Sequence, residues 1–230
     1  MLHPPCAGAE ARTTAIYLVL AYLLGAIPTG YLFARFVKGI DIRTIGSGNI
    51  GATNVLRAFG WRAGLSVMAV DMAKGALVAG PLAAWLGVAP GGWLAAAGGL
   101  AAVLGHDYTV FLAMRGGKGV ATSAGVLLVL APPSTLAALA LFVVVVLATR
   151  MVSAGSLAGA LGLPLFLWLF GERQAPLLCL ALLLTAFVWL KHVPNIRRML
   201  AGTESKISFG RRPREGASAP GREAERGERR

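Results

Sequence analysis

Residues 45–57 read Ile45-Gly46-Ser47-Gly48-Asn49-Ile50-Gly51-Ala52-Thr53-Asn54-Val55-Leu56-Arg57, and this polar stretch separates two long apolar runs. Its three glycines allow the backbone to turn tightly and to approach a ligand closely. Hydroxyl and amide side chains line it, and Arg57 adds a planar cation that suits phosphate or carboxylate. The stretch is interpreted as an anion-binding loop that leads into a helix N-terminus. The alternative is a glycine-rich connection with one helix-capping residue.

Two side chains of this loop are candidate catalytic residues, Ser47 and Arg57. Backbone or side-chain binding of phosphate is expected from five others, namely Gly48, Asn49, Gly51, Thr53 and Asn54.

The composition outside the loop is that of an integral membrane protein. Of 230 residues, 56% are apolar and only 14% are charged, whereas a soluble domain carries about 25% charged residues. Many of the basic residues behind the net charge of +12 lie in short loops or in the last part of the chain. Anionic lipid and anionic substrates therefore explain the charge better than nucleic acid does. Cys6 and Cys179 show no metal-binding spacing, so we expect neither a metal nor a disulfide.

Apolar runs predict an all-α bundle of about seven transmembrane helices. The expected spans are 15–37, 63–87, 93–113, 120–131, 134–149, 157–170 and 176–190. The fourth to sixth are shorter than the roughly 20 residues that cross a bilayer upright, so five crossings with two re-entrant pieces is the alternative. A short leader (1–14) would precede a membrane domain (15–202). The tail (203–230) is expected to be disordered from about residue 210 and dispensable for the chemistry.

Basic residues are distributed unevenly among the expected connections. One set of connections holds seven of them (Lys38, Arg43, Arg57, Arg62, Arg115, Lys118 and Arg150), and the other set holds only Arg173. The positive-inside rule then places the N-terminus outside and the C-terminus in the cytoplasm. All the polar, glycine-rich or basic stretches fall on the cytoplasmic side, where they can build one site.

A second candidate anion site is the sequence Gly116-Gly117-Lys118-Gly119. It lacks the spacing of a P-loop, but glycine N–H groups around one lysine form a cationic nest for phosphate. Lys118 is a candidate catalytic residue, and Gly116, Gly117, Gly119 and Thr122 are candidate phosphate-binding residues. The alternative is a tight turn between antiparallel helices.

Other polar residues near the expected helix ends allow two readings each. His192 and Asn195 are candidate catalytic residues, and His106, Arg150 and Ser153 are candidate binding residues. A lone histidine such as His106 is more often a structural hydrogen-bonding group. Arg150, Ser153 and Ser156 either line the site or cap the sixth helix, and capping is favoured for Ser156. Glu204 is read as structural.

Asp71 and Lys74 lie three residues apart within the second apolar span, and therefore on one helical face. Charges at this depth are usually paired. A structural ion pair and a role at the site both remain open, although Asp71 is expected to lie too deep for catalysis.

In three blocks the chain resembles the bacterial acyl-phosphate:glycerol-3-phosphate acyltransferases, the PlsY family. The blocks are 46–57, then Gly105-His106 with 116–122, and then Lys191-His192 with Asn195-Ile196 and Gly202-Thr203-Glu204. The resemblance covers roughly residues 18–208. The chain departs from the family pattern at Asp107, Thr109 and Val193, among others.

The resemblance implies acyl transfer from acyl phosphate to the 1-hydroxyl of glycerol 3-phosphate, which yields lysophosphatidic acid for phospholipid synthesis. It also implies a bundle of seven membrane helices, no cofactor, and a place in the bacterial inner membrane with the site facing the cytoplasm. Expected partners are the two substrates, membrane lipid and the soluble enzyme that forms the acyl phosphate. Functional residues of the family correspond to Ser47, Arg57, His106, Lys118, His192, Asn195 and the glycines of the second block.

The residues present fit this chemistry. Arg57, Lys118 and glycine N–H groups could hold two phosphates, and Ser47, Asn195 and backbone N–H groups are candidates to stabilise the oxyanion. Membrane acyltransferases that use acyl thioesters typically carry an aspartate five positions after a histidine, but here those positions are Gly8, Phe111 and Arg197. The donor's own phosphate is therefore expected to take the hydroxyl proton, with His192 holding geometry. The alternative function is a transporter of a phosphorylated solute.

Overall fold

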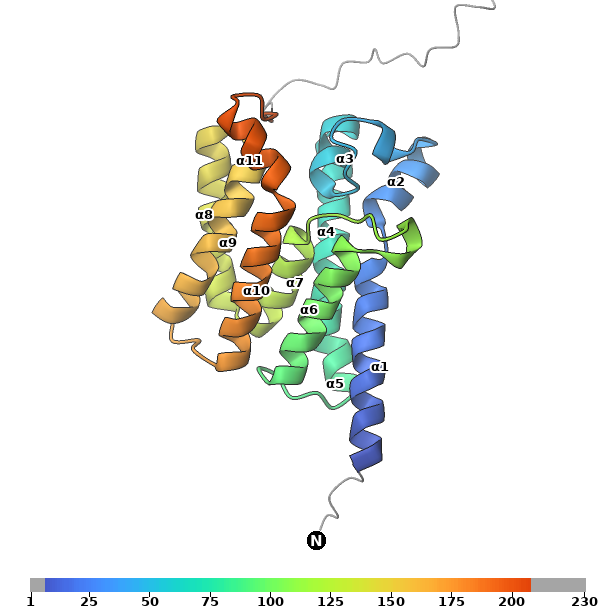
Figure 1. Ribbon diagram of the computed structural model, residues 1–230, viewed down its shortest axis with the longest axis vertical. Helices are drawn as coiled ribbons and strands as arrows, with labels where there is room; N and C mark the ends of the chain where they lie inside the picture. Colours follow the sequence, from blue (N-terminus) through green and yellow to red (C-terminus); the bar gives the residue numbers. More distant parts are fainter. Residues whose placement is uncertain (1–6, 208–230) are drawn as a thin grey trace, which may run out of the picture.

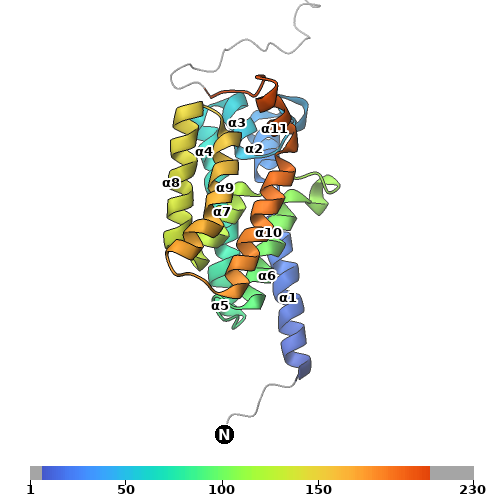
Figure 2. The same ribbon diagram turned by 60° about the vertical axis from the view of Figure 1, so that its left-hand side comes forward.

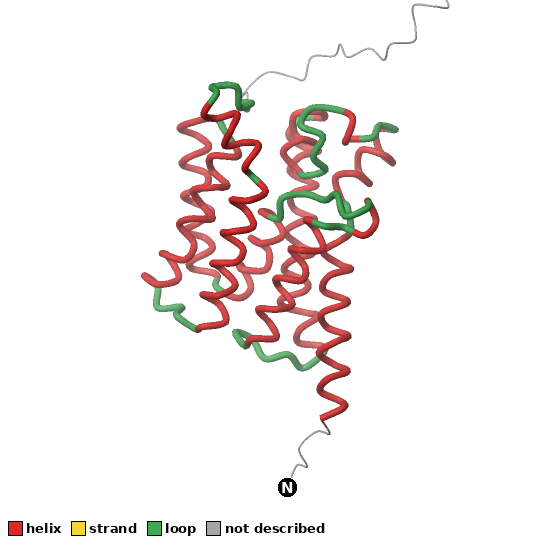
Figure 3. The backbone as a smooth tube through the Cα atoms, in the orientation of Figure 1, coloured by secondary structure: helices red, strands yellow, loops and turns green. Residues whose placement is uncertain are grey.

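The computed structural model describes residues 7–207 as an elongated bundle of helices, without strands in that range. The helices run nearly along one direction, and most connections gather at the two ends of the bundle (Figures 1 and 3). The described chain starts at the end where α1 (Ala7–Ala26) projects and finishes at the other end, beside α11 (Val193–Leu200). Figure 2 shows the same arrangement from a second side.

The first apolar run is not one continuous helix, which corrects the expected span 15–37. α1 ends at Ala26 and α2 (Thr29–Lys38) begins after Pro28, with a bend of 41° between them. Proline has no N–H and disfavours helical geometry in the residue before it, which explains the break. α1 also begins at Ala7, so residues 7–14 of the expected leader are helical rather than a separate polar segment.

The second and third runs match their expected positions closely. A span from Trp61 to Trp85 comprises α4 (Trp61–Leu77), a π-helical turn (Val78–Leu82) that contains Pro81, and α5 (Ala83–Trp85). α6 (Trp93–Asp107) follows, and a 3₁₀ turn (Val110–Leu112) extends it. Before α4, the polar loop contains a 3₁₀ turn (Ile42–Thr44) and leads into α3 (Ala52–Phe59).

The later helices begin earlier than the apolar pattern indicates. α7 (Val120–Leu130) is short, α8 (Pro132–Thr149) begins at the proline pair, and α9 (Val152–Leu169) includes both serines that follow Arg150. The capping role expected of Ser156 is wrong, because its hydroxyl donates to the Val152 carbonyl within α9 (3.0 Å). α10 (Ala175–Lys191) then bends by 55° into α11.

Small residues allow the helices to approach closely. A Cβ at Gly105 on α6 would collide with the Tyr22 carbonyl of α1, and a Cβ at Gly125 on α7 would collide with the Met72 carbonyl of α4. Such contacts are typical of membrane bundles, in which packing rather than the hydrophobic effect holds helices together. They join α6 to α1 and α7 to α4, and α4, α6 and α7 carry several of the buried polar residues, among them Asp71, His106 and Thr122.

By length and composition, four of the described helical segments can cross a membrane, or up to six if each bent pair is one span. The short α7 (Val120–Leu130) is apolar but does not reach the length of a crossing. The predicted all-α architecture is therefore confirmed, whereas the number of crossings stays a prediction. The tail from residue 210, which we expect to be disordered, lies outside the described residues.

Candidate active site

A cavity of about 160 Å³ lies at the end of the bundle where the glycine-rich loops gather. Six separate parts of the chain line it. They are the first polar loop with α3, the middle of α4, the end of α6, the glycine-lysine loop with α7, one face of α8, and α9 with the C-terminal segment. The five candidate catalytic residues all lie on its wall, and they are Ser47, Arg57, Lys118, His192 and Asn195. The convergence of the three polar sequence blocks on one site is thus present in the fold.

Asn54 lines the cavity, and its side chain organises the first loop. Its side chain is 2% exposed, its amide donates to the carbonyls of Ile42, Ile45 and Asn49, and its oxygen accepts from the Ser47 N–H (3.0 Å). An amide has two donors and one acceptor oxygen, so these contacts use the whole group. Asn54 therefore fixes the backbone that presents Ser47, whose own side chain is exposed at the cavity.

Asn49 and Thr53 lie beside the start of α3. The Asn49 side chain accepts from the Gly51 N–H (2.8 Å), a contact that turns the chain into the helix. Thr53 occupies the first turn, where helix N–H groups lack partners within the helix. Asn49, Gly51 and Thr53 line the cavity, whereas Gly48 does not.

Arg57 is the cation of the first loop that reaches the cavity. One terminal nitrogen donates to the Ser205 carbonyl (3.0 Å), while Nε is buried and has no partner among the described residues. A buried donor without a partner is costly, and an anion in the cavity would supply one. Burial lowers the pKa of Arg57, but an arginine remains protonated at neutral pH.

The glycine-lysine loop is held against the end of α6. Gly117 N–H donates to the His106 carbonyl (2.9 Å), and Gly116 N–H donates to the Asp107 carbonyl (3.2 Å). These two N–H groups are therefore occupied, and neither glycine lines the cavity. Gly119 does line it, with a positive φ of 69° immediately before the first turn of α7. Thr122 is fully buried one turn further on, away from the cavity wall.

Lys118 belongs to a hydrogen-bonded network with the C-terminal segment. Its ammonium donates to the Asn195 side-chain oxygen, and the Asn195 amide donates to Glu204 Oε1 (2.7 Å). Burial lowers the pKa of Lys118 to about 8, although the negative charge of Glu204 acts in the opposite direction. The lysine is thus held in place, and it remains mostly protonated at neutral pH.

Glu204 is the site residue that sequence reasoning assigned only a structural part. Its carboxylate accepts from Asn195, from the Ser153 hydroxyl (2.8 Å) and from Arg198 Nε (2.7 Å). Burial opposes its ionisation, but these hydrogen bonds hold the pKa of Glu204 below the ordinary value. Ser153 lines the cavity through this network, whereas Arg150 lies outside it and is exposed.

The two histidines of the cavity have opposite tautomers. His106 Nδ1 lies 2.8 Å from the Lys74 ammonium, which only donates, so Nδ1 must accept and the proton resides on Nε2. His192 Nδ1 lies 2.8 Å from the Val188 carbonyl, which only accepts, so Nδ1 carries the proton. In its neutral form, His192 therefore offers an acceptor nitrogen, and His106 does not.

Asp71 and Lys74 form the ion pair that was one of the two alternatives, with the two groups 2.9 Å apart. Both side chains are almost fully buried. Asp71 also lines the cavity, so its depth in the span does not separate it from the site. The apolar pattern placed Asp71 correctly within the helical span. It did not indicate that a cavity extends to that depth.

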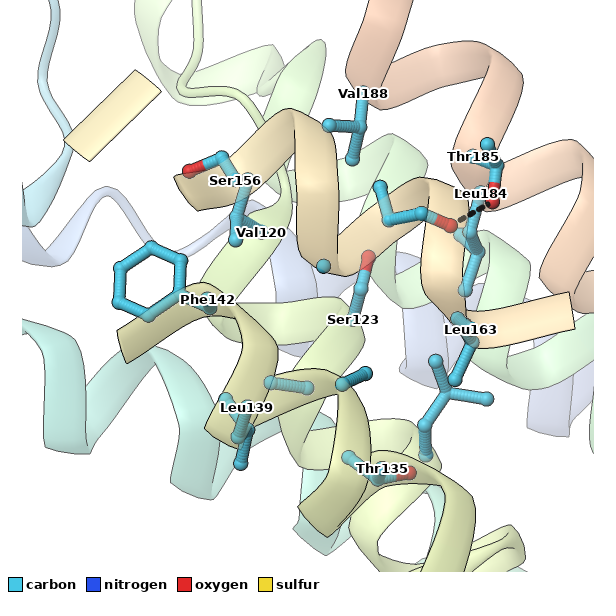
Figure 4. A pocket seen from close by; sticks show the side chains of 15 residues that line it. Val120, Ser123, Thr135, Leu139, Phe142, Ser156, Leu163, Leu184, Thr185 and Val188 are labelled. Atoms are coloured by element: carbon cyan, nitrogen blue, oxygen red, sulfur yellow. Dashed lines mark hydrogen bonds between the residues drawn. The ribbon is translucent and has the colours of Figure 1, made fainter. Parts of the chain in front are cut away.

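An apolar chamber of about 70 Å³ adjoins the cavity between α7, α8, α9 and α10. Val120, Phe142 and Ser156 belong to both walls, and Figure 4 shows them on one side of the chamber, with Thr135, Leu163 and Leu184 on the other. The hydroxyls of Thr135 and Thr185 donate to backbone carbonyls at 2.7 Å (Figure 4 shows the Thr185 bond). The chamber therefore has the character of a site for a hydrocarbon chain.

Comparison with known families and sequences identifies close relatives. Residues 15–202 match the glycerol-3-phosphate acyltransferase family. A glycerol-3-phosphate acyltransferase of Geobacter sulfurreducens is 49% identical over 192 residues, which cover 84% of this chain and 96% of that protein. One of Thermosynechococcus vestitus is 45% identical over 207 residues, which cover 85% and 97% of the two chains.

Solved structures agree with the sequences. The fold is similar to the crystal structure of PlsY (YgiH), an integral membrane glycerol 3-phosphate acyltransferase, in its glycerol 3-phosphate form, with a TM-score of 0.79 and 37% identity. That match covers 85% of this chain and 96% of the other. A lysophosphatidic acid form of PlsY gives a TM-score of 0.77, with 36% identity and coverage of 85% and 95%. The resemblance of the sequence blocks is thereby confirmed, and the chain belongs to the glycerol-3-phosphate acyltransferase family of integral membrane enzymes.

Proposed function

We propose that the protein transfers an acyl group from acyl phosphate to the 1-hydroxyl of glycerol 3-phosphate. One observation supports this proposal most directly. Arg57 and Lys118 line a single cavity, and that cavity adjoins an apolar chamber. Both substrates carry phosphate and one carries a hydrocarbon chain, so the reaction needs these features side by side. The membrane domain would comprise residues 15–202, Glu204 of the tail would help to position the site, and the tail beyond Gly210 would take no part in the chemistry.

The proposed reaction is a displacement at the acyl carbon. The 1-hydroxyl oxygen forms a bond to that carbon, the bond from the carbon to the phosphate oxygen breaks, and the hydroxyl proton passes to a phosphate oxygen. The products are lysophosphatidic acid and inorganic phosphate. Acyl phosphate is already activated, so the enzyme acts mainly by positioning the hydroxyl and stabilising the oxyanion.

The hydrogen bonds divide the roles among the site residues. The amide of Asn195 donates to Glu204 and its oxygen accepts from Lys118, so Asn195 positions the lysine. The Ser47 hydroxyl and the first-turn N–H groups of α7 are then the candidates to stabilise the oxyanion. His192 can accept a hydrogen bond through Nε2 and hold the attacking hydroxyl in line.

The acyl chain would extend from the cavity into the apolar chamber. Ala138 lies on α8 in the chamber wall, and replacing it with leucine would fill space that the chain needs. We expect Ala138→Leu to lower kcat/KM for long-chain relative to short-chain acyl phosphates by about 10-fold or more, since a buried methylene contributes about 0.8 kcal/mol. The measurement is kcat/KM across a series of saturated donors.

Ala140 is the matched control for this prediction, because it lies on the same helix, is exposed and does not line the chamber. Ala140→Leu should leave the chain-length profile unchanged. An unchanged profile in Ala138→Leu as well would exclude the chamber as the acyl site.

The orientation of the protein follows from the distribution of its charges. We propose that the cavity faces the cytoplasm from the bacterial inner membrane, with the N-terminus outside, because the basic loops lie at the cavity end. A soluble enzyme that forms acyl phosphate could then deliver the donor directly to the cavity.

Labelling of single cysteines tests this orientation in a background without Cys6 and Cys179. Cysteines at the exposed positions Thr44, Arg115 and Ala201 should react with an impermeant maleimide only after the cells are opened. A cysteine at the exposed position Ala89, in the turn between α5 and α6, should react in intact cells and serves as the control. The reverse pattern would contradict the orientation.

A transporter of a phosphorylated solute is the competing function, since it would also need an anion cluster. The two functions give different products. Purified protein in detergent should convert labelled glycerol 3-phosphate to a labelled lipid when acyl phosphate is added. Exchange of labelled glycerol 3-phosphate across proteoliposomes, without any lipid product, would instead establish a carrier.

A further inference from the structure

Asp71 is an anionic side chain in a cavity whose other polar groups mostly suit anions. It is 2% exposed and reaches the cavity wall from the middle of α4. Glu204 is the second carboxylate on that wall, but three donors occupy it. Asp71 is different, because its partners leave part of its carboxylate unused.

The Asp71 carboxylate has charged and polar neighbours but unused capacity to accept hydrogen bonds. Oδ1 lies 2.9 Å from the Lys74 ammonium and 3.6 Å from His106 Nδ1. Oδ1 is buried and accepts no hydrogen bond of ordinary geometry among the described residues. A carboxylate only accepts hydrogen bonds.

Lys74 is fully engaged and cannot serve as a third phosphate-binding cation. Its ammonium contacts Asp71, lies 2.8 Å from His106 Nδ1, and donates to the Ile27 carbonyl at the break between α1 and α2 (3.0 Å). An ammonium has three protons, so these partners use them all. The cluster therefore presents a carboxylate that can still accept a hydrogen bond, which repels phosphate and suits a hydroxyl.

The place of Asp71 indicates which hydroxyl it meets. Helix α4 contributes nothing to the apolar chamber, which α7 to α10 line. The acyl carbon and the attacking 1-hydroxyl must lie near the mouth of that chamber, beside Val120 and Phe142. The α4 side of the cavity then remains for the hydroxyl that does not react.

We propose that Asp71 accepts a hydrogen bond from the C2 hydroxyl of glycerol 3-phosphate and thereby selects the acceptor. This inference rests on the proposed function and adds a specificity-determining residue to it. Lys74 and His106 are positioning residues: Lys74 pairs with the carboxylate, and His106 accepts from Lys74 and holds its ammonium in place. A site that hydrogen-bonds a substrate hydroxyl strongly rejects the analogue that lacks it, because the buried group then stays unpaired.

The test compares glycerol 3-phosphate with 1,3-propanediol monophosphate, which lacks only the C2 hydroxyl. The wild-type protein should prefer glycerol 3-phosphate by about 100-fold or more in kcat/KM. Asp71→Ala should lower kcat/KM for glycerol 3-phosphate and leave the value for the analogue nearly unchanged, so that the preference falls to within about 10-fold. A purely structural role would lower both values by the same factor.

A second variant covers the case in which Asp71→Ala does not fold because Lys74 is left without its counter-charge. Asp71→Ala combined with Lys74→Gln removes both charges, and it should show the same loss of preference. Equal use of both acceptors by the wild type, or equal losses on both acceptors in a folded variant, would overturn the proposal. No acylation of either acceptor by the wild type would contradict the proposed function itself.

Discussion

Lys118→Ala is expected to reduce acyl transfer by between about 30-fold and several thousand-fold while leaving a folded protein in the membrane. Loss of one desolvated, charge-assisted contact to an anion costs about 2–5 kcal/mol. The side chain lies in a loop at the cavity, so its removal leaves the packing of the helices intact. The measurement is kcat/KM for both substrates in purified protein of matched folded fraction.

Arg57→Ala should reduce acyl transfer by a similar factor. Arg57 Nε is buried without a partner among the described residues, and an anion in the cavity can reach it. Arg115 provides the matched control, since it lies three residues before Lys118 but is exposed and outside the cavity wall. Arg115→Ala should retain most of the activity. Near-normal kinetics of Lys118→Ala or Arg57→Ala, at equal folded protein, would contradict the assignment of the two anion sites.

The pH dependence of the wild type provides a second readout of Lys118. Burial lowers the pKa of Lys118 to about 8, and a lysine loses its charge as pH rises through its pKa. We therefore expect kcat/KM to fall as pH rises above about 8, since this parameter reports ionisation in the free enzyme. Lys118→Arg should move this fall to higher pH, because arginine stays protonated. An alkaline limb that does not move would assign the titration to another group.

The sequence predicted the elements of the site better than their exact functions. Polar blocks stand out in an apolar chain, and the distribution of charge placed them at one end of the bundle. The cavity wall indeed contains Ser47, Arg57, Lys118, His192 and Asn195. The pattern of apolar and polar stretches does not predict the hydrogen-bond partner of each polar group, because these hydrogen bonds join segments that are distant in sequence.

Asn54, Gly117 and Glu204 illustrate this limit. Asn54 and Gly117 belong to motifs that are typical of ligand-binding loops, but their polar groups form hydrogen bonds that hold the loops in place. Glu204 lies in a non-helical segment after α11, and only the folding of that segment against α9 brings it to Ser153. The sequence did contain a signal for Asp71, a charge inside an apolar span, but not the depth of the cavity that reaches it.

The helix boundaries show a related limit. The prolines at 132–133 correctly ended the fourth expected span, but α8 begins at Pro132 rather than after the pair, and Pro28 breaks a run that was expected to be continuous. No sequence signal marked the start of α9 at Val152, since serines occur both at helix ends and inside membrane helices, where their hydroxyls bond to the preceding turn. Apolar runs therefore predict that these helices exist, but they do not predict the residue at which each helix begins.

Acyl phosphate is expected to be used as the donor and acyl-CoA is not. Neither histidine of the cavity donates to an aspartate, which would make it a strong base. His106 Nδ1 lies 3.6 Å from Asp71 Oδ1 but accepts from Lys74, and His192 Nδ1 donates to a backbone carbonyl. The proton must then go elsewhere. The phosphate oxygen that leaves the acyl carbon gains negative charge and can accept the proton, whereas a thioester brings neither this base nor a second anion for the cations of the site.

The most direct measurement compares the two donors with the same acyl chain, in one detergent preparation of the purified protein, with labelled glycerol 3-phosphate. We predict that lysophosphatidic acid forms with acyl phosphate, and that the rate with acyl-CoA is lower by at least about 1000-fold, as expected when several kcal/mol of phosphate contacts and the base are both lost. The Lys118→Ala protein serves as the control for contaminating enzymes. Comparable turnover with both donors by the wild type, absent from that control, would contradict the donor assignment and the transfer of the proton to the donor's phosphate.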